Sequence, residues 1–186
     1  MKSLHLAKPR ASMMVGVPGS GKSFFAEQFS ETFMTPYIDS ADIERLGKDH
    51  ASSARLIAHI LTEISKTQQT FILEGNADTK ALRADFAKFA KDHGYDPLFI
   101  WVQADRTTSR QRSARKGLSQ TAYLTALQRF EPPTENEKAI VISGRHTYAS
   151  QVRLVLSFIG QESRAAAPVA HERLASPIVP ARRTTR

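Results

Sequence analysis

Residues 16–23, with the sequence GVPGSGKS, combine glycines with a lysine and a serine at a fixed spacing. The spacing Gly16-x-x-x-x-Gly21-Lys22-Ser23 fits the phosphate-binding loop (P-loop) pattern GxxxxGK[ST]. Glycines let backbone N–H groups turn toward phosphate oxygens without a clash from a Cβ atom. In such a loop the lysine reaches the β- and γ-phosphates, and the serine hydroxyl coordinates Mg²⁺. The loop therefore predicts an ATP site with Mg²⁺, in which Ser23 is the metal ligand.

The loop should be followed by a helix whose positive dipole end points at the bound anion. Lys22 is the candidate catalytic cation of this site, and we expect it to face solvent when no phosphate is bound. A glycine turn with an incidental lysine is the alternative interpretation. The loop residues expected to contact the nucleotide are Gly16, Pro18, Gly19, Ser20, Gly21, Lys22 and Ser23.

Two aspartates follow a short apolar segment in the stretch YIDSADIERL at 37–46. Asp42 is the candidate general base, because a carboxylate near the γ-phosphate can take the proton from an attacking hydroxyl. Arg45 would lie on the same side of a helical turn, where it can bind an anionic acceptor. An aspartate at this place can instead be only a helix N-cap. Asp39 is the second candidate for the base, or a residue that orders the water shell of Mg²⁺.

The stretch ILEGN at 72–76 ends another apolar segment with an acid and an amide. Glu74 stands where many P-loop proteins place the acid that serves the metal; a plain surface loop is the alternative. The pattern lacks the Asp-Glu pair of ATP hydrolases, which counts against a motor ATPase. The residues expected on the acceptor side are Asp39, Arg45, Glu74 and Asn76.

Residues 105–117, DRTTSRQRSARKG, are rich in arginine. One helical face of this segment carries Arg112, Arg115 and Lys116, which indicates a lid over the phosphates. Arg112 and Lys116 are expected to bind the nucleotide. Arg115 is the candidate for the cation that stabilises the transferring phosphoryl group, as an arginine finger does. A solvated basic helix is the alternative. Arg145, in the stretch ISGRHTY, is expected beside the nucleotide base.

Short apolar segments alternate with helical patterns along the chain. Near-continuous apolar strands separated by helices predict an α/β fold, in which five parallel strands carry helices on both faces in three layers. Ligands bind at the carboxyl ends of such strands, and each polar cluster above follows a predicted strand. The predicted strands are 12–17, 35–40, 70–75, 97–103 and 138–143. The first predicted helix begins at Ser23. The other predicted helices cover 52–66, 79–93, 106–116, 120–130 and 147–159.

Composition limits the class of protein further. The chain has 186 residues, a formal net charge of +8 and no cysteine, which excludes disulfides and thiolate catalysis and favours anionic partners. No apolar run approaches the ~20 residues of a membrane-spanning helix, and no signal peptide is evident, so the cytoplasm is the expected compartment. We expect a kinase domain at 1–162. Residues 163–186, with five arginines and one glutamate, are expected to be a disordered basic tail, either a nucleic-acid arm or a solvated terminus.

The motifs GVPGSGKS, SADIER, FILEGN and RQRSARKG, in this order over about residues 12–160, resemble the phage-type polynucleotide 5′-hydroxyl kinase group. The resemblance implies an adenylate-kinase-like fold and transfer of the ATP γ-phosphate to a nucleic-acid hydroxyl. It implies that Asp42 is the general base, that Arg45 binds an acceptor phosphate and that the lid cation is Arg115 or Lys116. The chain departs from the group where Asp42-Ile43 replaces an Asp-Asp pair and Glu74-Gly75-Asn76 replaces Asp-Thr-Asn.

Three functions remain open at this point. The first is a kinase acting on nucleic acid, with DNA favoured, either at a 5′-hydroxyl end or at a hydroxymethylated base. The second is a small-molecule, nucleotide or protein kinase with the same chemistry. The third is an ATP-binding module or slow ATPase without an acceptor, against which the pairing of Asp42 with Arg45 argues.

Overall fold

The computed structural model describes residue 6 and residues 8–165. Residues 166–186, and with them most of the basic tail expected at 163–186, lie outside the described part. No helix within the described ranges is long and apolar enough to cross a bilayer.

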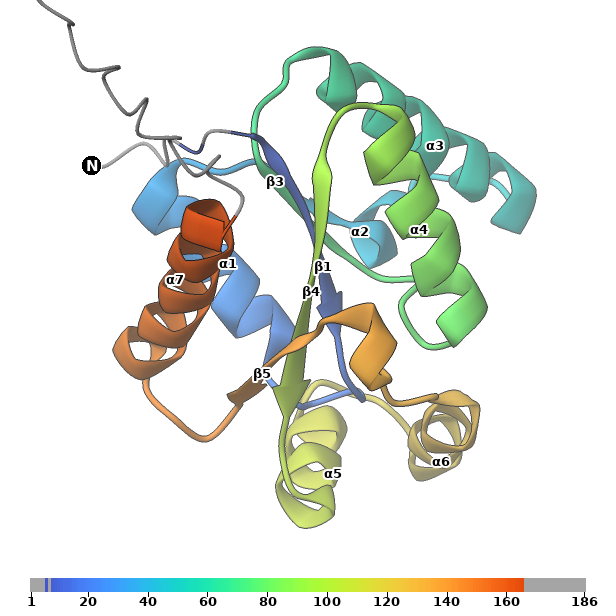
Figure 1. Ribbon diagram of the computed structural model, residues 1–186. Helices are drawn as coiled ribbons and strands as arrows, with labels where there is room; N and C mark the ends of the chain where they lie inside the picture. The colour runs from blue at the N-terminus through green and yellow to red at the C-terminus, as the bar shows by residue number, and fades with distance from the viewer. Residues whose placement is uncertain (1–5, 7, 166–186) are drawn as a thin grey trace, which may run out of the picture.

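A five-stranded sheet forms the centre of the fold, with the strand order β2-β3-β1-β4-β5 (Figure 1). Every adjacent pair of strands is parallel, as the sequence predicts. Each observed strand lies within one or two residues of its predicted range. The strands are β1 Arg10–Val15, β2 Tyr37–Asp39, β3 Phe71–Glu74, β4 Asp96–Gln103 and β5 Ile140–Ser143.

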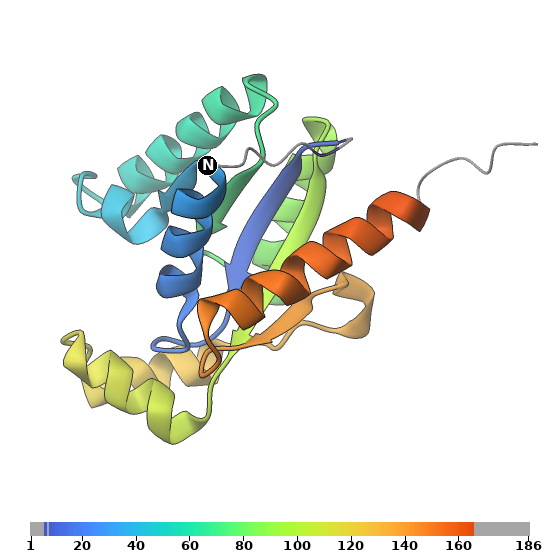
Figure 2. The same ribbon diagram turned by 90° about the vertical axis from the view of Figure 1, so that its left-hand side faces the viewer.

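Helices cover both faces of the sheet, which gives the three predicted layers. Helices α1 and α7 cover one face, α3 and α4 cover the other, and α5 and α6 lie beyond the carboxyl ends of the strands (Figures 1 and 2). The helices are α1 Lys22–Phe33, α2 Ser40–Glu44, α3 His50–Lys66, α4 Lys80–Asp92, α5 Arg106–Arg115, α6 Gln120–Arg129 and α7 Tyr148–Ala165, with a 3₁₀ turn at Glu135–Glu137. The sequence indicates only a helical turn where α2 forms and does not predict the 3₁₀ turn, and α7 runs six residues past its predicted end.

Two apolar clusters fill the space between the layers, because side chains of a strand point alternately to opposite faces. Met13 and Val15 of β1 belong to the cluster under α3 and α4, whereas Met14 belongs to the cluster under α1 and α7. In α1, Phe25 and Phe29 are buried at the spacing of four that one face of a helix requires. In α3, Ile57 is buried, whereas the neighbouring Leu56 is 39% exposed.

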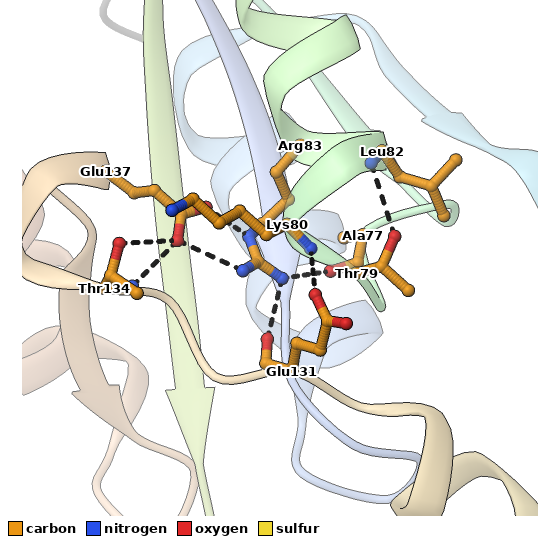
Figure 3. Close-up of polar contacts among 8 residues, drawn as sticks. All are labelled: Ala77, Thr79, Lys80, Leu82, Arg83, Glu131, Thr134 and Glu137. Carbon is orange, nitrogen blue, oxygen red and sulfur yellow. Dashed lines mark hydrogen bonds and ion pairs between the residues drawn. The ribbon is translucent and has the colours of Figure 1, made fainter.

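Arg83 lies on the inner side of α4 and is fully buried (Figure 3). Its guanidinium donates to both carboxylate oxygens of Glu137, at 2.6 and 3.2 Å, and to the carbonyl oxygens of Ala77 and Glu131, at 2.9 and 2.8 Å. Glu137 also accepts from the backbone N–H of Thr134 at 2.8 Å. Arg83 therefore fastens the segment that follows α6 to the start of α4, and it holds the loop that carries Asp78.

Replacing Arg83 with methionine should lower the free energy of unfolding by about 3 kcal/mol, because the largely covered carboxylate of Glu137 would lose its cationic partner. Burial alone would raise the pKa of Glu137, but the bonds from Arg83 and Thr134 lower it below its ordinary value of 4.5. This contribution is therefore complete above the ordinary pKa and is lost as the pH falls through the folded-state pKa.

Urea unfolding at pH 7 and pH 4 measures both effects, with Arg153→Met on the exposed side of α7 as the matched control. The Arg83→Met protein should lose stability at pH 7 and show a weaker decline toward pH 4 than the unaltered chain. Equal stability of the two methionine variants would contradict this role for Arg83.

Candidate active site

The loop between β1 and α1 is held from two sides. Gly19 has a φ of +76°, and a Cβ atom there would lie 2.1 Å from the carbonyl oxygen of Ser109 in α5. On the other side, a Cβ atom on Gly144 would lie 1.8 Å from the carbonyl oxygen of Ser20. Arg112 joins the two walls, since it donates to the carbonyl oxygen of Gly144 at 2.8 Å. The predicted lid helix thus packs directly on the phosphate-binding loop in this structure.

Lys22 is only partly exposed, so the expectation that it faces solvent is met only in part. Its Nζ donates to the carbonyl oxygens of Gly16 and Val17 at 2.9 and 3.2 Å, within the loop itself. Burial lowers the pKa of Lys22, and the positive charge of Lys116 lowers it further, against the opposing effect of nearby carboxylates. The ammonium is therefore held where phosphate oxygens would replace the two carbonyls as its partners.

Ser23, Glu74 and Tyr37 form a chain of hydrogen bonds beside Lys22. The Ser23 hydroxyl donates to Oε1 of Glu74 at 3.1 Å, and the Tyr37 hydroxyl donates to Oε2 at 2.7 Å. Burial and the bond to Glu74 raise the pKa of Tyr37, so it remains a donor at neutral pH. Sequence reasoning missed Tyr37, because a tyrosine in a strand carries no signal of a contact with the next strand.

Ser23 and Glu74 fit a magnesium ion, since hydroxyl and carboxylate oxygens are the ligands that this ion prefers. In the described ranges, no group of three or more acidic or histidine side chains is placed to hold a metal. A site with one hydroxyl and one carboxylate therefore suits an ion that also takes phosphate oxygens and water.

The second strand places its two aspartates differently from each other. Asp39 is the N-cap of α2 and accepts from the backbone N–H of Ala41 at 2.9 Å. The alternative that Asp42 is the cap is therefore wrong. Asp42 lies in the first turn of α2, where it accepts from Arg45 at 2.6 Å, as the i, i+3 spacing predicts. The two side chains are 66% and 75% exposed, which leaves both accessible to an acceptor.

The loop after β3 lies against α2. A Cβ atom on Gly75 would lie 1.6 Å from the hydroxyl oxygen of Ser40, and Glu74 is paired in register with Asp39. Asn76 follows with an exposed side chain and a φ of +52°. The expected acceptor-side residues thus come from two adjoining segments at the carboxyl ends of β2 and β3.

The charged groups with the largest effect on the pKa of Lys22 are Glu74, Asp78, Lys116 and Asp39. Asp78 is an acid that sequence reasoning missed, although it stands only four residues after Glu74. It also pairs with Arg129 of α6 at 3.7 Å. Asp42 is absent from this group, because its carboxylate is directed toward Arg45 on the exposed side of α2.

Helix α5 presents several cations near the loop. Arg145 pairs with Asp105 at 3.4 Å, ahead of this helix. Four further cations of the segment are exposed and have no ionic partner in the described part of the chain: Arg106, Arg110, Arg115 and Lys116. Of the expected lid cations, Lys116 is the one whose positive charge lowers the pKa of Lys22.

Gly19→Ala should weaken ATP binding about tenfold or more. The new Cβ atom would collide with the backbone of α5, and alanine disfavours the positive φ of this residue. Gly94→Ala is the matched control, since Gly94 has a similar φ of +84° but meets only the side chain of Gln68, at 3.5 Å. Calorimetric titration with ATP measures the effect. The interpretation fails if Gly19→Ala binds ATP as tightly as Gly94→Ala does.

A parallel five-stranded sheet with a GxxxxGKS loop at the start of the first helix defines a P-loop kinase-like ATP-binding fold. The family described as "AAA domain" matches residues 12–133, and the chain belongs to this family. No curated protein matches the chain.

Three solved structures illustrate the likeness of fold. A gluconokinase from Sinorhizobium meliloti has a TM-score of 0.65 and 16% identity, over 87% of this chain and 97% of that one. The Mycobacterium tuberculosis APS kinase, solved with AMPPNP and APS, has a TM-score of 0.62 and 16% identity, over 82% and 98%. A chain of the Pnkp1/Rnl/Hen1 RNA repair complex has a TM-score of 0.57 and 18% identity, over 68% and 45%. At these identities the likeness shows the P-loop kinase fold alone and does not single out the phage-type polynucleotide kinase group.

Proposed function

We propose that this protein transfers the γ-phosphate of ATP to a hydroxyl group of a nucleic-acid substrate, at a 5′-hydroxyl end or on a hydroxymethylated base. The observation that carries the proposal is the meeting of Lys22, Ser23 and Glu74 at the start of α1. This arrangement supplies a cation for the phosphates and two oxygen ligands for a metal at one place.

The loop N–H groups and the start of α1 bind the phosphates of ATP. Lys22 leaves its two carbonyl partners and binds the β- and γ-phosphates. Ser23 and Glu74 would hold Mg²⁺, which would act as a Lewis acid that stabilises negative charge on the phosphate oxygens. Cations of α5, with Arg115 or Lys116 foremost, neutralise charge on the transferring group.

Asp42 takes the proton of the acceptor hydroxyl while the hydroxyl oxygen forms a bond to the γ-phosphorus of ATP. The bond between the γ-phosphorus and the β–γ bridging oxygen breaks, and its electron pair stays on ADP. Arg45 exchanges its bond to Asp42 for an acceptor phosphate, which frees the carboxylate for the proton.

Four exposed cations of the α5 segment have no ionic partner among the described residues, and they support a polyanionic substrate because such surface cations attract phosphates. The sequence resemblance to polynucleotide kinases points the same way, and one similar structure belongs to an RNA repair complex. A small-molecule acceptor is the second candidate, since two similar structures are a gluconokinase and an APS kinase.

Transfer of labelled γ-phosphate to a panel of acceptors distinguishes these candidates. The panel contains 5′-hydroxyl DNA, 5′-hydroxyl RNA, duplex DNA with hydroxymethylated bases, nucleosides, gluconate and APS. A nucleic-acid acceptor should be labelled, and the logarithm of its affinity should fall with the logarithm of salt by about 0.7–0.9 for each phosphate contact. Labelling of a small molecule alone, without salt dependence, would contradict the nucleic-acid proposal. Removal of residues 163–186 should reduce the dependence of affinity on salt if this tail is a nucleic-acid arm.

A further inference from the structure

A cavity of about 500 Å³ lies where α5 and α6 meet the carboxyl end of β4. Its walls are largely apolar and aromatic, and one wall residue belongs to the phosphate-binding loop. The main wall residues are Val17, Trp101, Tyr123, Leu124, Leu127 and Phe130. Of the α5 cations given a role in the transfer reaction, Arg106 alone lines it, whereas Lys22, Ser23, Asp42 and Glu74 do not.

The walls of this cavity are fixed in place. The Tyr123 hydroxyl is bonded to the Ser109 hydroxyl at 2.7 Å, and it donates to the carbonyl oxygen of Arg106 at 3.3 Å. Phe130 packs on Trp101 with ring centroids 6.4 Å apart, and it directly precedes the segment that Arg83 fastens. The polar end of Tyr123 is thus satisfied internally, while ring and aliphatic surfaces line the cavity.

Two amide side chains line the same cavity without an internal partner. Gln103, at the end of β4, and Gln128, in α6, make no side-chain hydrogen bond to any described residue. Both glutamines are exposed, and an amide offers both a donor and an acceptor, so a ligand with both kinds of group on one edge can replace water on them. Arg106 lines the cavity as well and brings it next to the unpaired cations of α5.

The cavity lies on the acceptor side of the sheet. Trp101 and Phe130 pack against the cluster under α3 and α4, to which Ile43 of the Asp42 helix also belongs. Arg145, expected beside the base of ATP, follows β5 in the loop that leads into α7, and α7 covers the opposite face of the sheet (Figure 2). Val17 connects the cavity to the phosphate-binding loop, so a group bound there lies beside the site of transfer.

From these observations we infer that the cavity binds an uncharged planar heterocycle of the acceptor, a nucleobase, between its apolar walls and its two amides. The inference rests on the proposed function and specifies which part of the acceptor the protein contacts away from the reacting hydroxyl. Stacking on aromatic and aliphatic walls supplies affinity, and Gln103 and Gln128 favour a ring edge with both donors and acceptors.

Trp101 is the only tryptophan of the chain, so its fluorescence reports on this cavity directly. We would titrate the full chain and its Lys22→Ala variant with nucleosides, a 5′-hydroxyl oligonucleotide and ATP. A nucleobase compound should change the emission of both proteins, because Lys22 takes no part in the cavity. A response to ATP alone would assign the cavity to adenine and overturn the inference.

Leu127→Phe fills the cavity without adding charge. It should raise the KM for the acceptor about tenfold and leave the KM for ATP and kcat within twofold. Leu154→Phe, at a leucine of α7 that is 50% exposed, is the matched control. If nucleic acid is phosphorylated but neither the emission nor the KM changes, the inference is wrong and the proposed function stands. If no nucleic acid is phosphorylated, the transfer assay reports that failure separately, and a nucleoside response in the emission would still support the cavity as a heterocycle site.

Discussion

Replacing Lys22 with alanine is expected to lower phosphotransfer by at least ~10²–10³-fold, because preorganised charge at the phosphates contributes several kcal/mol to the transition state. The side chain holds a defined position against the carbonyl oxygens of Gly16 and Val17 before any phosphate arrives. Its loss removes the one cation that the loop itself supplies. The rate of label transfer from ATP under saturating acceptor measures the effect.

Lys66→Ala is the matched control for this variant, because Lys66 is 65% exposed and pairs only with Glu63. The control should keep its rate. Lys22→Ala should keep the fold, since the ammonium bonds only carbonyl groups of its own loop, and thermal unfolding checks this. A Lys22→Ala protein with near-normal turnover would contradict the assignment of the loop.

Asp42→Asn should lower the rate by ~10²–10⁴-fold, the range for loss of a general base, and leave ATP affinity unchanged. Asparagine keeps the size of the side chain but cannot take the proton. The substitution should not affect the capping of α2, because Asp39 is the residue that caps this helix. Single-turnover rates and ATP titrations measure the two quantities.

Two neighbouring acids provide the comparison for Asp42. Asp39→Asn keeps the cap, since asparagine caps a helix about as well as aspartate, so we expect a milder loss that added Mg²⁺ partly restores. Asp78→Asn tests the other carboxylate near Lys22. If Asp42→Asn keeps its rate while Asp39→Asn or Asp78→Asn loses most of it, the general base is that other residue. The reason for assigning Arg45 to an acceptor phosphate would then be lost.

The sequence predicts the sheet and most helices because their signals are local. Long apolar runs such as the one in β4 mark buried strands, and the spacing of Phe25 and Phe29 marks the inner face of α1. The spacing of glycine and lysine likewise marks the loop. Of helix α2, only a helical turn with Asp42 and Arg45 could be predicted, because five residues are too few to show a helical period.

The missing parts of the site are contacts between distant segments. Tyr37 of β2 reaches Glu74 of the neighbouring strand β3, and Arg112 reaches Gly144 across 32 residues. The burial of Arg83 could not be predicted for the same reason. A charged residue is expected on the outer face of a helix, and the sequence does not show that Glu137 is its partner. Such contacts depend on the packing of elements, which no local pattern contains.

The most direct test of the central claim follows the labelled γ-phosphate of ATP and asks where it goes. With Mg²⁺ and a hydroxyl-bearing acceptor, we expect most of the label to appear covalently bound to the acceptor, and little as inorganic phosphate. Omission of Mg²⁺ or substitution of Lys22 should abolish this transfer. Release of the label only as inorganic phosphate, whatever acceptor is offered, would contradict the account and identify an ATPase.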